Sequence, residues 1–312
     1  MNAPAPLATR TLAACVSCGG RELRALPLAY EFRGRFPLVE CAGCGLRFLG
    51  VQPVGESLAG LYSAEYFERD FRCGRSAVAY ASGEAFRAEN ESLLDAFERL
   101  GPDPGAPPAR APRRLLEVGS AGGWLLQQAQ ARGWRTQGVE LSAAAAERAR
   151  TLGLEVFQGD LLAAALPAGS FDVAYMGDVL EHVPDCRAVL DEVARLLRPG
   201  GHLYLRGPVT TNSLARRLAL ALYGAAGRTI VLREPPYHLW EFTPGPLARL
   251  FRAAGLEVVS ARQSKIGPGR PHGEKSAAQR LAMAAVDALN LPLTRLLGVA
   301  GDRIVVVGRK PR

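Results

Sequence analysis

The run from Leu115 to Trp124 constrains the fold more than any other part of the chain. It reads as an apolar strand that ends in the acid Glu117 and then breaks into a glycine-rich turn before a helix. Gly119 and Gly123 have no Cβ atom, so the backbone can turn sharply and pass close to a ligand, as the first turn of a nucleotide-binding βαβ unit requires. The run therefore predicts an α/β domain that holds a nucleoside cofactor at this turn.

A second strand supports the nucleoside. It spans residues 135–139 and ends in Glu140, 23 residues after Glu117. An acid at this spacing can hold two ribose hydroxyls through its two oxygens. The spacing fits a nucleoside, but it does not indicate the reaction.

Two further strands lead into motifs that are typical of one enzyme family. The strand at 154–158 leads into Gly159-Asp160, and the strand at 171–176 leads into Gly-Asp-Val-Leu-Glu-His at 177–182. Leu-Leu-Arg-Pro-Gly-Gly-His-Leu follows at 196–203. As a set, these motifs resemble the class I S-adenosylmethionine-dependent methyltransferases, in particular the small-molecule group whose fourth strand ends in Leu-Glu-His. The resemblance covers residues 113–262 and the last ten, and it implies an α/β fold with a Rossmann-like seven-stranded sheet.

The resemblance also implies a site for S-adenosyl-L-methionine at the carboxyl ends of the first four strands. Its expected residues are Glu117, Gly119, Ala121, Gly123, Glu140, Leu141, Asp160, Leu161, Gly177 and Asp178. Ala121 stands where a dinucleotide-binding dehydrogenase would carry glycine, and a dehydrogenase would more often close on a pyrophosphate at the helix start. Ala121 also departs from the commonest methyltransferase form.

Methyl transfer to a hydroxyl needs a group that takes the proton of the acceptor. Of the four histidines in the chain, His182 at the mouth of the fourth strand and His238 on the substrate side lie where a base would be useful. We expect these two residues to be catalytic, with a structural hydrogen-bonding role as the alternative for each. Asp178 could orient either imidazole or face the amino acid end of the cofactor.

Two long insertions carry the expectations about the substrate. Residues 208–242 follow the fifth strand, and residues 267–301 separate the sixth strand from the last. In the resembled family a His-Leu-x-x-Phe-Thr run, found here at 238–243, lines the substrate side of the pocket. This implies substrate contacts for Tyr237, His238 and Trp240. Connections of this length that contain helices more often form lids or surfaces that bind a partner than loops without a function.

Charge is uneven along the chain. Residues 205–312 hold 17 basic and 6 acidic side chains, whereas residues 1–204 hold 21 and 24. A basic substrate end favours a small-molecule substrate that is anionic or carrier-bound, although arginines that only solvate helix faces would look the same. Nucleic acid is not expected, because no basic patch is interleaved with stacking aromatics. The amphipathic stretch at 276–289 could lie on a membrane surface, but core or lid packing is favoured.

Two cysteine pairs precede this domain. Cys15-x2-Cys18 and Cys41-x2-Cys44 are 22 residues apart, and each pair lies beside glycine. This spacing is typical of a four-cysteine zinc ribbon. The alternatives are two disulfides, which would be strained across such short loops, or four free thiols. Four thiolates leave no open coordination position, so we expect the zinc to be structural.

The domain organisation follows from these motifs. We expect a zinc-ribbon and helical region at 1–100, a proline-rich linker at 101–112 and the methyltransferase domain at 113–312. Tyr62 and Tyr66 are expected to pack against the catalytic domain, with a substrate or cofactor contact as the alternative. No apolar run reaches the roughly 18 residues of a membrane span, and no secretion signal is evident, so we expect a cytoplasmic protein.

Together these features predict methyl transfer from S-adenosylmethionine to a hydroxyl of a sugar, a polyketide or another secondary metabolite. One alternative is an RNA base methyltransferase, but the fourth strand lacks the Asn-Pro-Pro-Tyr type of run used on exocyclic amines. A noncatalytic cofactor-binding or scaffold protein is an alternative of another class. The intact acids at 117, 140 and 160 argue against it.

Overall fold

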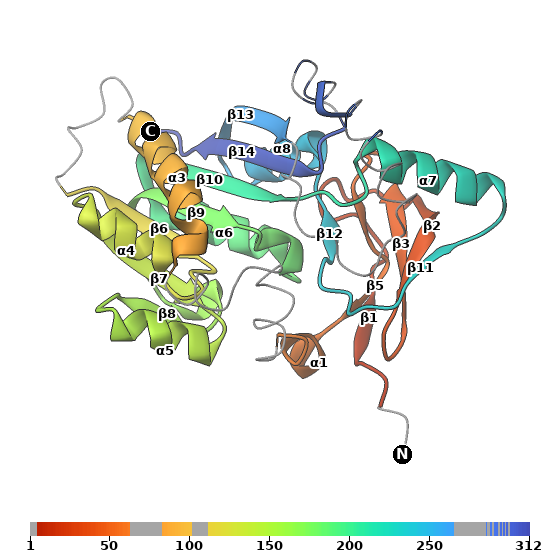
Figure 1. Ribbon diagram of the computed structural model, residues 1–312, viewed down its shortest axis with the longest axis horizontal. Coiled ribbons are helices and arrows are strands. Elements are labelled where there is room, and N and C mark those ends of the chain that lie inside the picture. The colour runs from red at the N-terminus through yellow and green to blue at the C-terminus, as the bar shows by residue number, and fades with distance from the viewer. Residues whose placement is uncertain are drawn as a thin grey trace.

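One seven-stranded sheet organises the larger part of the molecule (Figure 1). The computed structural model describes residues 5–62, 83–101, 112–264 and 300–312, together with scattered residues between 285 and 298. The strand order in this sheet is β13-β14-β10-β9-β6-β7-β8. The strands are β6 (Arg114–Val118), β7 (Arg135–Glu140), β8 (Val156–Gln158), β9 (Phe171–Gly177), β10 (Leu197–Pro208), β13 (Glu257–Ser264) and β14 (Arg303–Arg309).

The path of the chain through this sheet creates a binding edge. Strands β6 to β10 are parallel to one another, whereas β14 lies between β10 and β13 and is antiparallel to both. The chain starts in the middle at β6, moves outward through β7 and β8, and then returns to β9 on the other side of β6. The crevice at such a switch point, beyond the carboxyl ends of the strands, is where open α/β sheets bind ligands. The seven-stranded sheet that the resemblance implied is confirmed.

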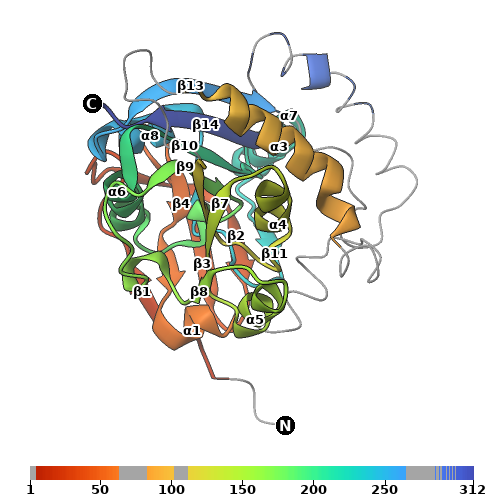
Figure 2. The ribbon, with the colours of Figure 1, turned by 90° about the vertical axis from the view of Figure 1, so that its left-hand side faces the viewer.

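Helices cover both faces of this sheet, as Figure 2 shows, because successive strand residues point to opposite faces. Leu115, Val173 and Tyr175 pack in one core cluster beneath α3, α4 and α5. Their sequence neighbours Leu116 and Met176 point to the opposite face and pack in the other cluster with α6 and α8. The helices are α3 (Arg87–Arg99), α4 (Trp124–Ala131), α5 (Ala143–Thr151), α6 (Cys186–Leu196) and α8 (Pro244–Ala253).

A second sheet joins the amino-terminal region to the first insertion. Its order is β11-β2-β3-β4-β12, and its two outer strands come from residues of the 208–242 insertion. Ile230 pairs with Leu28 at one edge, and Trp240 pairs with Phe48 at the other. The strands are β2 (Leu23–Glu31), β3 (Arg35–Cys41), β4 (Arg47–Leu49), β11 (Ile230–Leu232) and β12 (Trp240–Glu241). We call this five-stranded sheet the ribbon sheet.

Smaller elements complete the fold. A two-stranded sheet pairs β1 (Thr9–Thr11) with β5 (Val51–Pro53), and helix α1 (Gly55–Ala59) follows it. Helix α7 (Leu214–Ala225) confirms the helix expected in the first insertion and lies beside the ribbon sheet (Figure 1). Short 3-10 helices occupy Glu84–Phe86, Leu161–Ala163 and Leu180–His182. Among the described helices, none is both long and apolar enough to span a bilayer.

The helical part of the region expected at 1–100 includes α3, which packs on the seven-stranded sheet. Phe97 lies 5.5 Å from Tyr175 and 5.4 Å from Tyr204 between ring centroids, and Arg206 forms a 2.5 Å ion pair with Glu89. Strand β10 begins at Leu197, before the Pro-Gly-Gly segment, and its pairing with β9 shifts register between Leu197 and His202, where Gly200 has a φ of 76°. Residues 102–111 of the expected linker, Tyr66, and residues 267–284 of the second insertion lie outside the described residues.

Candidate functional site

The glycine-rich turn after β6 adopts the backbone that its sequence predicts. Gly119, Ala121 and Gly123 all have positive φ angles, of 75°, 47° and 81°. A Cβ atom at Gly119 would overlap the Val179 side chain, and one at Gly123 would overlap Leu154, so both positions require glycine. Ala121 adopts the left-handed conformation despite its Cβ, which costs a non-glycine residue about 1–2 kcal/mol.

Glu140 closes this turn from the end of β7. Its Oε2 accepts a hydrogen bond of 2.8 Å from the Ala121 N–H, and its Oε1 accepts one of 2.8 Å from the Ser142 N–H. Burial raises the pKa of the carboxyl group, and the backbone donors oppose that shift. Each carboxylate oxygen has a second lone pair. The carboxylate is therefore fixed in orientation and keeps capacity to accept two ligand hydroxyls.

Glu117 and Ser120 place unsatisfied polar atoms beside the same turn. Glu117 is 7% exposed and Ser120 3% exposed. Among the described residues, Glu117 Oε2 and Ser120 Oγ have no hydrogen-bond partner. Burial, and secondarily the charge of Glu140, raise the pKa of Glu117 well above its ordinary value, while the positive charge of Arg206 opposes this. Buried polar atoms without partners are rare and costly, so these two favour a polar ligand at the turn.

The remaining expected cofactor residues lie at the same edge of the sheet. Leu141 is 54% exposed, although it follows a buried strand, and can cover an aromatic base. Asp160 accepts the Ala163 N–H at 2.9 Å and so caps the 3-10 helix in which Leu161 is buried. Gly177 ends β9 where a Cβ atom would overlap the Tyr175 hydroxyl. This cradle of glycine backbone, buried acids and an exposed leucine fits S-adenosylmethionine.

Asp178 follows with a positive φ of 56°. Its Oδ2 lies 3.4 Å from an Arg303 nitrogen, and its Oδ1 is buried without a partner among the described residues. The Asp178 charge acts on His182 and His238 through space, since no hydrogen bond joins the carboxylate to either imidazole. Asp178 therefore makes no direct contact through which it could orient an imidazole. Its other expected role, to face the amino acid end of the cofactor, stays a prediction.

The structure brings His182 and His238 together. Their ring centroids are 4.9 Å apart, although one lies after β9 and the other in the first insertion. His182 Nδ1 is 2.9 Å from the Tyr237 carbonyl oxygen and 3.0 Å from the Tyr62 hydroxyl. Burial lowers the pKa of His182 to about 3 and that of His238 to about 4. Both imidazoles are therefore neutral near pH 7 and present lone pairs.

Backbone hydrogen bonds hold the His238 segment in place. The Leu239 N–H donates to the Glu181 carbonyl at 2.8 Å, and the Leu239 carbonyl accepts the Leu49 N–H at 3.0 Å and the Gln52 side-chain amide at 3.3 Å. The segment is thus fixed between the 3-10 helix after β9 and the ribbon region. This explains how a residue of a long insertion reaches the edge of the seven-stranded sheet.

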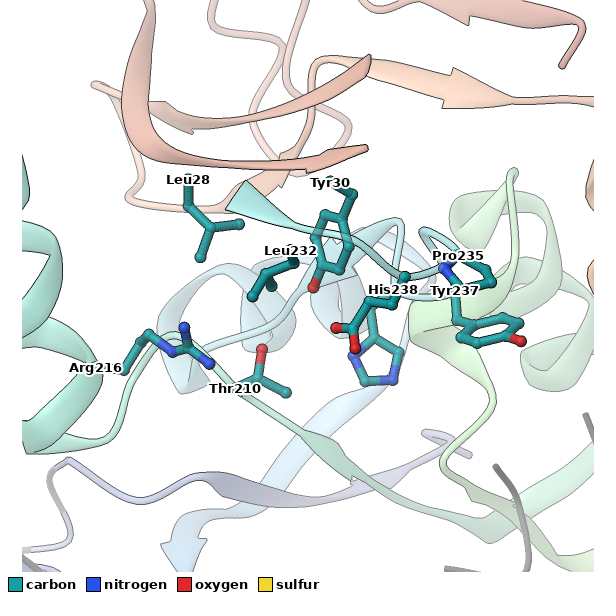
Figure 3. Close-up of a pocket in the computed structure, with 9 residues that line it drawn as sticks. Leu28, Tyr30, Thr210, Arg216, Leu232, Pro235, Tyr237 and His238 are labelled. Carbon is teal, nitrogen blue, oxygen red and sulfur yellow. The ribbon is translucent and has the colours of Figure 1, made fainter. Parts of the chain in front are cut away.

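A cavity of about 140 Å³ opens next to His238 (Figure 3). Leu28 and Tyr30 of β2 form one wall, and residues of the insertion form the rest. The lining residues are Leu28, Tyr30, Thr210, Arg216, Leu232, Glu234, Pro235, Tyr237 and His238. Tyr237 and His238 were expected on the substrate side, whereas the contribution of β2 was not.

Trp240 lies in the core instead of lining this cavity. It is 2% exposed, and its indole N–H donates to the Val183 carbonyl at 2.8 Å. Its ring lies 5.6 Å from Phe48 and 6.4 Å from Phe242. Sequence reasoning also missed Glu181, which is 2% exposed beside His182. Its position inside the Leu-Glu-His run is the sequence feature that could have indicated a site residue.

The four cysteines meet in one cluster. The sulfurs of Cys15 and Cys44 are 3.5 Å apart, as are those of Cys18 and Cys41. This is too long for a disulfide bond of about 2.05 Å and close to the edge of about 3.8 Å of a tetrahedron with Zn–S bonds of about 2.3 Å. All four sulfurs lie within 4.8 Å of one another. The donor set fits a tetrahedral zinc ion.

The two cysteine turns have the same construction. Gly19 donates its N–H to the Cys15 carbonyl and Gly45 donates to the Cys41 carbonyl, each at 2.8 Å. Their φ angles are 73° and 74°. A backbone N–H of Gly20 lowers the pKa of the Cys18 thiol, whereas burial raises those of Cys15 and Cys44. The repeated turn aims two pairs of thiols at one point.

Comparisons with known proteins agree on the larger domain. Residues 85–261, more than half of the chain, match a family model described as a methyltransferase domain. The chain is 31% identical over 169 residues to the ubiquinone biosynthesis O-methyltransferase of Cupriavidus pinatubonensis, which covers 51% of this chain and 66% of that protein. It is 35% identical over 161 residues to the protein of the same name from Thiobacillus denitrificans, covering 48% and 68%. The chain thus spans about two thirds of the length of these relatives. A crystal structure of a SAM-dependent methyltransferase from Thermotoga maritima aligns with a TM-score of 0.47 and 22% identity over 81% of this chain and 98% of that one.

Proposed function

The chain belongs to the methyltransferase-domain family with the class I sheet, and from this premise we propose that it methylates a hydroxyl group of a small molecule. The observation that carries the proposal is the cavity of about 140 Å³ that reaches His238. A cavity of about 150 Å³ holds one benzene ring, so the acceptor group is the size of a single ring. The relatives named as O-methyltransferases support oxygen as the methylated atom.

Bound S-adenosylmethionine supplies an electrophilic methyl group on a sulfonium sulfur. Glu140 holds the ribose hydroxyls, while Glu117 and Ser120 hold the polar amino acid end of the cofactor. Leu141 packs on the base. The residues around the cofactor therefore position it and exclude water, which supplies much of the rate enhancement in a transfer of this kind.

The acceptor enters from the cavity between β2 and the first insertion. The imidazoles of His182 and His238 supply lone pairs where the acceptor hydroxyl must lose its proton. Arg216 and Glu234 both line the cavity and can bind polar groups of the acceptor. A hydroxyl on a sugar, a polyketide or a phenolic ring satisfies these features. The cysteine cluster binds one structural zinc ion, which holds the ribbon sheet that forms the cavity wall.

Calorimetry with S-adenosylhomocysteine tests the cofactor site. Glu140→Ala removes the acceptor of two ligand hydrogen bonds, each worth about 1.5–3 kcal/mol, so affinity should fall at least about tenfold. The matched control is Glu147→Ala, an exposed glutamate on the neighbouring helix α5. Equal affinity of the wild type and both variants would refute the role of Glu140. A wild-type chain that does not bind the product would favour the scaffold alternative.

Transfer of a labelled methyl group tests the acceptor. The panel contains a diphenol, a glycoside and a short RNA, each paired with a control in which the hydroxyls are already methylated. Label in the diphenol or glycoside, absent from its methylated control, supports the proposal. Label in the RNA alone would contradict it and favour RNA base methylation.

A further inference from the structure

A second group of metal-ligating side chains lies outside the cysteine cluster. Glu181, His182 and His238 each offer a ligand atom, and these atoms lie within 4.8 Å of one another. The first two residues follow β9 and the third belongs to the insertion, so the fold assembles the group. Two imidazoles and one carboxylate form a common protein site for divalent transition-metal ions.

Hydrogen bonding fixes the tautomer of His182. Its Nδ1 lies 2.9 Å from the Tyr237 carbonyl oxygen, and a carbonyl can only accept, so Nδ1 carries the proton. In a neutral imidazole Nε2 then carries a lone pair. A backbone acceptor on the other ring nitrogen is also the usual way in which a ligating histidine is oriented.

A carboxylate oxygen lies near this nitrogen. His182 Nε2 lies 3.8 Å from Glu181 Oε1. This oxygen is buried and has no hydrogen-bond partner among the described residues, and the Glu181 side chain is 3% exposed. At 3.8 Å these two atoms are too far apart to form a hydrogen bond with each other, and a cation between them would satisfy both. The position of Glu181 thus points independently to a ligand.

The separations suit a bound ion. Nitrogen and oxygen ligands lie about 2.0–2.2 Å from zinc, so two ligands of one ion are about 3.4 Å apart in a tetrahedron. The observed 3.8 Å between Nε2 and Oε1 requires a shift of only a few tenths of an ångström. Imidazole ligands select against Mg²⁺ and Ca²⁺, which prefer oxygen.

We propose that Glu181, His182 and His238 bind one divalent transition-metal ion, of the Zn²⁺ or Mn²⁺ type, at the inner end of the acceptor cavity. Three protein ligands leave one coordination position open, as in catalytic zinc sites. The acceptor hydroxyl takes that position through its oxygen. The two histidines then act as ligands instead of bases.

The role of the ion in methyl transfer rests on the proposed function, whereas the ion site itself does not. An oxygen that binds the ion has a lowered pKa, so its proton leaves to water. The oxygen then forms a bond to the methyl carbon as the bond from carbon to sulfur breaks. The sulfur keeps the electron pair and leaves as the thioether of S-adenosylhomocysteine.

Zinc counting on the purified full chain tests the site without an activity assay. The wild type, dialysed against micromolar free Zn²⁺, should hold two zinc ions per chain. Glu181→Gln and His238→Asn should each hold one, and the remaining ion should be lost with Cys18→Ser. The matched control is Glu241→Gln, because Glu241 is equally buried but accepts hydrogen bonds from Thr210 and Thr211. This control should keep both ions.

Binding of S-adenosylhomocysteine is measured on the same samples to show that each variant is folded. One zinc in the wild type, or two in both Glu181→Gln and His238→Asn, would overturn the ion site. If the product binds while the second zinc is missing, the ion proposal fails and the proposed function stands. If the second zinc is present but the product does not bind, the site is supported and the proposed function fails.

Discussion

Replacing Glu117 by glutamine should make the protein more stable and a weaker binder of its cofactor. The buried Glu117 carboxyl has one oxygen without a partner among the described residues. An unsatisfied buried polar group costs about 1–3 kcal/mol, and more when it is charged. Glutamine has nearly the same shape and cannot ionise, so it removes the charge without opening a cavity.

The effect should depend on pH in a defined direction. Burial and the Glu140 charge raise the folded-state pKa of Glu117 above the unfolded value. The native state therefore holds a proton that the unfolded state releases, and the free energy of unfolding falls as pH rises between the two pKa values. At about pH 4, below both values, the wild type and Glu117→Gln should be nearly equal. At about pH 8 the variant should be more stable by about 1–3 kcal/mol.

Urea unfolding at both pH values measures the stability difference, and calorimetry with S-adenosylmethionine measures binding. Loss of a charged partner for the amino acid end of the cofactor should lower affinity about tenfold or more. Glu241→Gln is the control, because its carboxylate accepts hydrogen bonds from Thr210 and Thr211 and the variant should be less stable. A Glu117→Gln variant that is less stable than the wild type at high pH, or that has the same pH dependence, would refute the reasoning.

Three other variants test separate features. Cys18→Ser should lose the zinc ion of the cysteine cluster and the ordered structure of the ribbon sheet, while its affinity for S-adenosylhomocysteine stays unchanged. Metal analysis that finds no zinc in the wild type would contradict this prediction. Ala121→Gly should raise the free energy of unfolding by up to about 1 kcal/mol, because relief of the left-handed strain exceeds the entropy that glycine adds to the unfolded chain. A lower free energy of unfolding in urea would contradict this prediction. Trp240→Phe removes the indole donor to the partly buried Val183 carbonyl and should cost about 1–3 kcal/mol without changing the Michaelis constant for the acceptor. A raised Michaelis constant for the acceptor would indicate that Trp240 contacts the substrate.

The seven-stranded sheet could be predicted because the motifs at the strand ends resemble those of the class I methyltransferases. Strands β6 and β9 are mostly apolar and lead into glycine, and the turn at Gly119 and Gly123 requires conformations that few residues adopt. The acids at the strand ends could be predicted for the same reason. Parallel strands bring such positions to one edge whatever the details of side-chain packing.

Pairings between distant residues could not be predicted. Nothing in the sequence near Ile230 indicates that it pairs with Leu28, because a three-residue strand has almost no pattern of its own. The resemblance implies a substrate contact for Trp240, because the His-Leu-x-x-Phe-Thr run lines the substrate side of the pocket in the resembled family. Its burial follows from the register with Phe48, which only the assembled sheet determines.

The shared ribbon sheet limits how this protein can be re-engineered. Its cavity is a composite of β2, from the start of the chain, and β11 with the following loop, from a segment two hundred residues later. Exchanging the insertion alone for that of another methyltransferase would leave one edge of β2 without its partner strand and the Leu28 and Tyr30 wall of the cavity unchanged. A transplant of acceptor specificity must therefore move both segments together, and natural sequence changes in one are expected to be matched by changes in the other.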